Sequence, residues 1–143
     1  MATNMTLHFE GPAIKGADQI EVLAWDHGIS PGGSRSGGGD SPRNVFNFSK
    51  YMDAGSTELM RLCWSGQQFQ KATVRCYRSD GMTDNKPVEY LRITMQNVAI
   101  ADVSVSGAGG GVPVENIRLE YGTLGYTYTD HKLAASSVSS PPA

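Results

Sequence analysis

The sequence has little excess charge of either sign and no long apolar run, and each shortage excludes a class of protein. With 12 basic and 14 acidic residues among 143, it lacks the basic footprint of a nucleic-acid-binding protein. No stretch approaches the ~18 apolar residues of a membrane span, so we expect no membrane insertion. The N-terminal residues lack the pattern of a secretory signal, which predicts a protein made and folded in the cytoplasm.

Cysteine and histidine are also scarce, which argues against metal and redox sites. Cys63 and Cys76 are the two cysteines, and their separation matches neither a CxxC pair nor a zinc pattern, so we expect buried thiols. His8 and His131 lie near opposite ends of the chain, without an HExxH motif. The glycine run 107–112 lacks the GK[ST] and following helix of a phosphate loop, which favours a hairpin loop. We therefore predict neither a metal nor a cofactor.

Apolar residues that alternate with polar ones recur along most of the chain, the pattern of half-buried antiparallel strands. Glycine-rich and proline-containing breaks separate these segments, as expected for turns. The pattern predicts an all-β sandwich or barrel. The sets that should each share one strand face are Ile20, Val22 and Ala24; Ala72, Val74 and Cys76; Leu91, Ile93 and Met95; Val103 and Val105; Ile117, Leu119 and Tyr121; and Tyr126 and Tyr128.

One helix is predicted over residues 57–65, with Ser56 or Thr57 as its cap and Gly66 as its left-handed stop. Its apolar residues sweep about 200 degrees, more than the stripe of a simple surface helix. Leu59, Leu62 and Cys63 should pack on the strands. The remaining apolar residues, Met60 and Trp64, either meet a second subunit or are covered by a loop of the same chain.

These patterns define one domain over residues 1–133, followed by a polar tail at 134–143 that we expect to be flexible. The predicted fold is mainly β, an antiparallel two-sheet β-barrel with one flanking α-helix and an extended glycine-rich loop. A chain of this length needs a single core.

Several segments, in order along the chain, carry a resemblance to a known family. The match runs from Ile20 to Thr129 and resembles the hemolysin-coregulated proteins (Hcp), the tube subunits of type VI secretion systems. The segments are IEVLAWDHGIS, the loop PGGSRSGGGDSPRN, FNFSKYMD, LMRLCWSG, VEYLRITMQNVAIADVSVSG and ENIRLEYGTLGYTYT.

The resemblance implies a structural protein that forms homohexameric rings with an open channel. Such rings stack into a tube that a trimeric spike caps and a contractile sheath surrounds, and they can carry effector proteins. Secretion toward a target cell would then need no signal peptide. The resemblance places Asp26 toward the channel, where six copies would favour basic cargo. The loop 31–44, with Gly37, Gly38 and Gly39, can order against the next ring, since glycine permits the backbone angles required.

Two other classes compete with this interpretation. A monomeric carbohydrate- or ligand-binding β-barrel would use the tyrosines at 121, 126 and 128 as a stacking surface. An enzyme is not predicted, because Asp26 and His27, which would serve Ser30, are neighbours on a strand and point to opposite faces. Scattered carboxylates could still approach one another as a glycosidase pair does. They are Asp53, Glu89, Asp102, Glu115 and Glu120.

Overall fold

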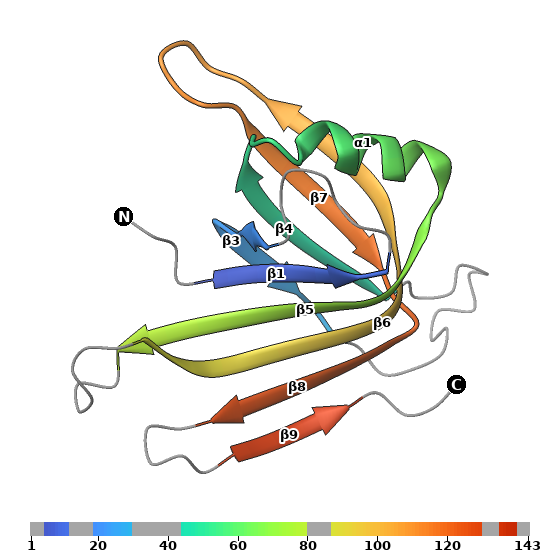
Figure 1. Cartoon of the computed structure of the whole chain (residues 1–143). Helices are drawn as coiled ribbons and strands as arrows, with labels where there is room; N and C mark the ends of the chain where they lie inside the picture. The colour runs from blue at the N-terminus through green and yellow to red at the C-terminus, as the bar shows by residue number, and fades with distance from the viewer. Residues whose placement is uncertain (1–4, 12–18, 30–43, 80–86, 130–134, 140–143) are drawn as a thin grey trace.

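The computed structural model describes residues 5–11, 19–29, 44–79, 87–129 and 135–139, and in these residues antiparallel strands surround a core beside one helix (Figure 1). The prediction of a mainly β chain with one helix is confirmed for the part described. No described helix is long and apolar enough to cross a membrane. The elements are β1 Met5–Glu10, β2 Ile20–Glu21, β3 Ala24–His27, β4 Val45–Tyr51, α1 Ser56–Ser65, β5 Gln68–Ser79, β6 Pro87–Ser106, β7 Val114–Glu120, β8 Thr123–Thr129 and β9 Ala135–Ser139.

The 20-residue strand β6 organises the sheet. Its first half pairs with β5 on one side and β8 on the other, and its second half pairs with β7. The hydrogen-bonded order is β2-β1-β5-β6-β7-β4-β3, with β8 and β9 added beside β6. Figure 1 shows β6 curving upward from the β5 and β8 side toward β7 and α1. One strand therefore belongs to both halves of the fold.

The predicted two-sheet barrel is not confirmed, because the described strands form one nine-stranded sheet. The sheet order begins with β2 and ends with β3, which are consecutive pieces of the chain. Two backbone hydrogen bonds lie where they meet: Val22 N–H donates to Met5 O at 3.0 Å, and Leu23 N–H donates to Ser49 O at 2.8 Å. The segment 20–27 thus touches both ends of the sheet.

Most of the predicted strand faces are confirmed by burial. Val74, Ile93 and Leu119 are fully buried. The residues two positions away on the same faces are also buried, namely Ala72, Cys76, Met95 and Ile117. Ala24 was predicted to share a face with Ile20 and Val22, and this is wrong, because Ala24 is exposed. The alternation slips by one residue at the break between β2 and β3. In β3, Trp25 instead packs against the core.

Helix α1 begins one residue earlier than predicted and ends as predicted. The predicted cap at Ser56 or Thr57 is wrong, because Gly55 occupies the N-cap position with no side-chain cap. Ser56 is already helical, and its Oγ accepts a hydrogen bond from the Asp53 backbone N–H at 2.9 Å. Gly66 has φ of 70° and donates to backbone carbonyls of the last turn, so the left-handed stop is confirmed. Leu59 and Leu62 are buried as predicted, and Cys63 is half-buried against the core.

Two features near the ends of strands complete the fold. The glycine run 107–111 lies between β6 and β7, which pair antiparallel, so the predicted hairpin is confirmed. Residues 135–139, within the segment predicted as a flexible tail, pair with β8 as strand β9, an element that the sequence did not predict. Gly37, Gly38 and Gly39 lie outside the described residues.

Candidate functional site: a polar groove on the outer sheet face

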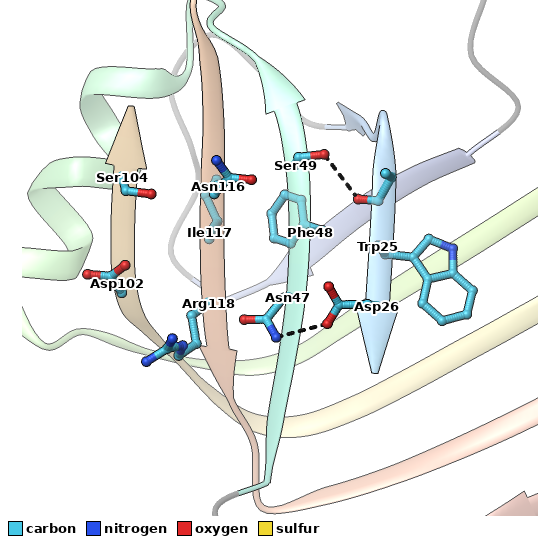
Figure 2. Close-up of a pocket in the computed structure, with 11 residues that line it drawn as sticks. Trp25, Asp26, Asn47, Phe48, Ser49, Asp102, Ser104, Asn116, Ile117 and Arg118 are labelled. Carbon is cyan, nitrogen blue, oxygen red and sulfur yellow. Dashed lines mark hydrogen bonds between the residues drawn. The ribbon is translucent and has the colours of Figure 1, made fainter. Parts of the chain in front are cut away.

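A polar groove of about 370 Å³ lies on the face of β3, β4, β7 and β6 that points away from the core (Figure 2). The alternation of each strand produces it, because residues next to buried ones must point outward. Its chemistry is that of amides, hydroxyls and both signs of charge. The polar side chains that line it are Asp26, Asn47, Ser49, Asp102, Ser104, Asn116 and Arg118.

The register arranges these side chains in rows across the sheet. Asp26 pairs with Asn47, Asn47 pairs with Arg118, and Arg118 pairs with Asp102, so one row crosses four strands. Within it, the Asn47 Nδ2–H donates to Asp26 Oδ1 at 3.0 Å. Figure 2 shows these side chains on one side of the strands, while Trp25 points to the other side of β3. The row carries two carboxylates and one guanidinium.

The side chain of Asp26 is exposed on this hollow polar face, and its position toward a channel stays a prediction. Three strand spacings of about 4.8 Å put Asp26 and Asp102 roughly 14 Å apart across the sheet. Glycosidase carboxyl groups are about 5–9.5 Å apart, so these two do not form such a pair.

His27, next along β3, points to the opposite face and meets two tyrosines. Its Nδ1 lies 2.7 Å from the Tyr126 hydroxyl and its Nε2 lies 2.7 Å from the Tyr121 hydroxyl. Burial lowers the pKa of His27, and the nearby Asp26 carboxylate raises it by less. Asp26 and His27 thus diverge as predicted for neighbours on a strand, and Ser30 lies outside the described residues.

These contacts also decide what the tyrosines can do. Tyr121 and Tyr126 are partly buried against the core and hydrogen-bond to His27, so neither ring stands fully exposed for stacking on a sugar. Tyr128 is 43 % exposed and meets Tyr90 edge-on, with ring centroids 6.5 Å apart. A three-tyrosine stacking surface is therefore absent from the described structure.

A buried charge network lies where α1 begins. The Lys50 ammonium contacts Glu115 Oε1 at 2.7 Å, Ser56 Oγ at 3.1 Å and Asp53 Oδ1 at 3.1 Å. Lys50 and Glu115 are fully buried. No sequence pattern indicates this network, because Lys50 and Glu115 are 65 residues apart. It ties β4, β7 and the helix together.

The two candidate interface residues on helix α1, Met60 and Trp64, differ in how exposed they are. Trp64 is 88 % exposed, and Met60 is partly exposed. No described segment covers the Trp64 ring, so a loop of the same chain does not account for it within the described structure. Arg61, between them in sequence, pairs with Glu58 through two hydrogen bonds of 2.8 Å.

The comparisons with known proteins all point to the same family. The profile of the family described as "Type VI secretion system effector, Hcp" matches residues 10–128. Protein hcp1 of Pseudomonas aeruginosa is 34 % identical over 131 residues, which cover 87 % of this chain and 79 % of that protein.

Solved structures are similar over almost the whole chain. Hcp1 from Salmonella typhimurium has a TM-score of 0.75 at 26 % identity and covers 97 % of this chain and 94 % of its own. A mutant Hcp1 of E. coli EAEC 042 has a TM-score of 0.74 at 25 % identity. The match covers 96 % of this chain and 98 % of that one. A type VI secretion system effector from Yersinia pestis shares the fold, with a TM-score of 0.76 at 24 % identity. The match covers 95 % of this chain and 98 % of that one.

Proposed function

We propose that this chain, which belongs to the Hcp family of type VI secretion proteins, builds the inner tube of such a system from stacked homohexameric rings. The family consists of structural secreted tube proteins and is not a family of enzymes, so the chain is a tube subunit. The six-fold ring and its stacking are the proposal.

The polar groove carries this proposal. A sheet with a buried apolar face and a hollow polar outer face suits the wall of a water-filled channel, where charged and amide groups stay hydrated. The groove lies on β3, β4, β7 and β6, and we assign this face to the lumen. The same assignment turns Asp26 toward the channel, as the family resemblance implies.

Six copies of Asp26 would form a negative ring in the lumen. The row that contains it has two carboxylates and one arginine, so the net charge of the row is also negative. Effector proteins with basic surfaces are therefore the favoured cargo. Retention of a basic protein should weaken in Asp26→Asn rings, and equal retention would contradict this role.

The subunit interface is assigned to the exposed side of α1. An indole that is 88 % exposed in the isolated chain suits an interface, where tryptophan is enriched at energetically dominant positions. Trp64 would be the main contact and Met60 a secondary one. A heterologous contact of this kind closes after a fixed number of copies if its rotation permits.

The proposal includes two further features, one in the loop 31–44 and one in the segment 20–27. The glycines Gly37, Gly38 and Gly39 belong to a loop that docks on the next ring. The segment 20–27 closes the sheet into a two-sheet barrel, supported by its hydrogen bonds to both ends of the sheet order.

The partners and location follow from the family. We propose that the tube contacts a trimeric spike and a contractile sheath, and that rings carry effectors without binding nucleic acid or inserting into a membrane. Assembly would take place in the cytoplasm, before ejection without a signal peptide.

Light scattering of the purified chain, with negative-stain imaging of the same fraction, tests the ring. We expect a particle of about six times the 15.3 kDa chain mass with a central hole. A monomer at every concentration would overturn the proposal. The monomeric carbohydrate-binding alternative would then rest on the same groove, whose Asp, Asn and Arg side chains can bind hydroxyls.

A further inference from the structure

The Lys50 ammonium has acceptors on β7, on α1 and in the segment between β4 and α1. They are Glu115 Oε1 at 2.7 Å, Ser56 Oγ at 3.1 Å and Asp53 Oδ1 at 3.1 Å. An ammonium group has three N–H donors and no acceptor, so this set matches its capacity. We call these residues, together with Lys50, the anchor network. Because Lys50 is fully buried, its charge is satisfied only while the start of α1 stays against β7.

The polar side chains at the start of α1 serve this network and do not cap the helix. Serine and aspartate are common N-cap residues, but Gly55 occupies the N-cap here, with no side-chain cap. Ser56 Oγ accepts hydrogen bonds from Lys50 Nζ–H and from the Asp53 backbone N–H. Asp53 Oδ1 also accepts the Gly55 N–H, at 3.0 Å. The first residue of α1 is thus tied to the neighbouring strands.

Farther along, α1 is held by apolar contacts, which determine its rotation less strictly. Leu59 and Leu62 are buried, and the burial of apolar surface is favourable without depending on direction. Hydrogen bonds weaken steeply when their angle changes. At about 100° per residue, the rotation of a helix about its axis decides where an exposed side chain such as Trp64 points. The anchor network supplies a directional contact that fixes this rotation.

Stability alone gives little reason for such a network. The cost of removing two charges from water offsets their attraction, so a well-packed apolar pair is often as stable. A role in selecting one arrangement of packed elements is the alternative, and the contacts of Lys50 with both α1 and β7 are suited to it.

We propose that the anchor network positions helix α1 and thereby fixes the surface that its exposed side offers to a second copy of this chain. Without the network, α1 still packs through its leucines but no longer holds one rotation. The effect on assembly rests on the proposed function, whereas the positioning of α1 does not.

Hydrogen exchange in the full chain tests the positioning. Lys50→Met/Glu115→Leu removes both charges, so the β6 amides should keep wild-type protection. The Leu59 N–H, which donates to Gly55 O at 3.1 Å, should lose protection by about tenfold or more, the factor for one hydrogen bond to a charged group. A parallel measurement in the Trp64→Ser background removes protection that a subunit contact would add. Unchanged Leu59 protection, or an equal loss in β6, would overturn the proposal.

A second variant keeps the test decisive if the double variant folds poorly. Ser56→Ala keeps the ion pair and removes the acceptor on α1. Alanine has a higher helix propensity than serine, so helix propensity alone would raise the protection of the Leu59 amide. Positioning by the network predicts that this protection falls by more than that of the β6 amides, and a rise would contradict it.

Arg92→Gln is the matched control. It removes an ion pair with Glu89 on the first half of β6, where the Arg92 side chain is 47 % exposed. Both the α1 amides and the β6 amides should keep wild-type protection, because water screens this pair.

Ring dissociation on dilution, followed by light scattering, measures the effect on assembly. In Lys50→Met/Glu115→Leu the concentration at which rings dissociate should rise by about tenfold or more at unchanged free energy of unfolding, because a dominant tryptophan contact is misplaced. A purely stabilising network would leave this concentration unchanged. If the wild type forms no ring, the tube proposal fails while Leu59 exchange still reports the positioning. If rings form and the double variant dissociates as the wild type does, the positioning proposal fails alone.

Discussion

Lys50 and Glu115 form a fully buried pair of opposite charges. Both side chains are fully buried, and their 2.7 Å contact is supported by Ser56 and Asp53 around the ammonium. Glu115 Oε2 has no hydrogen-bond partner in the described structure, so this carboxylate depends on Lys50 for its compensation. Removing either partner would leave a buried charge unpaired.

Substituting one member of the pair and substituting both should therefore have different effects on the free energy of unfolding. Lys50→Met or Glu115→Leu alone should lower the free energy of unfolding by about 3–5 kcal/mol, because each strands the other charge. The double variant Lys50→Met/Glu115→Leu should be as stable as the wild type or more stable. Urea unfolding measures all three.

Arg61→Gln serves as the control for this cycle. Arg61 pairs with Glu58 on the exposed side of α1, where water screens the ion pair, so unfolding should be unchanged within error. Additive losses in the double variant would contradict the interpretation of Lys50 and Glu115 as one compensated pair.

For single residues, the alternation of apolar and polar side chains could predict which strand residues are buried, and little else. The exposure of Asp26 was implied by the family resemblance and not by alternation, which grouped Ala24 with the buried Ile20 and Val22. The partners of His27, 94 and 99 residues away, could not be predicted, since only the folded register brings β3 beside Tyr121 and Tyr126. Lys50 resembled an ordinary surface lysine for the same reason.

Among the elements, helix α1 and the long strands were predictable because local rules determine them. The left-handed glycine at 66 and the apolar spacing of Leu59 and Leu62 were sufficient for the helix. Strand β9 was not predictable, because residues 135–139 are small and polar and are ordered by their ladder with β8. The face of β3 depends on a slip at Leu23 that no periodicity shows.

The proposed docking role of the loop 31–44 can be tested by replacing the loop, whose sequence is rich in glycine. A short Gly-Ser linker in place of these residues should leave the core and α1 unchanged, so rings should still form. Stacks should be lost, because this linker lacks the segment that we propose docks on the next ring. Negative-stain imaging measures ring and stack numbers, and normal tubes would contradict the docking role.

At the scale of the whole molecule, the described residues present two surfaces of different chemistry. The groove on β3, β4, β7 and β6 is polar and hollow, whereas α1 exposes an aromatic ring on the flank of the sheet. A polar surface stays hydrated at little cost, and an exposed indole gains free energy when it leaves water. Association through α1 leaves the groove open, which is the geometry that a channel needs.

This division of surfaces predicts how stability depends on protein concentration. If folded chains assemble, the Tm should rise with concentration, because assembly binds only the folded state. Trp64→Ser should remove most of this dependence while changing the Tm of the dilute chain little, since the ring is 88 % exposed there. Calorimetry over a hundredfold concentration range measures both.

Tyr51→Ser, at an exposed aromatic on β4, is the matched control and should keep the wild-type slope of Tm against concentration. An unchanged slope in Trp64→Ser would move the subunit interface away from α1, even if light scattering showed a ring.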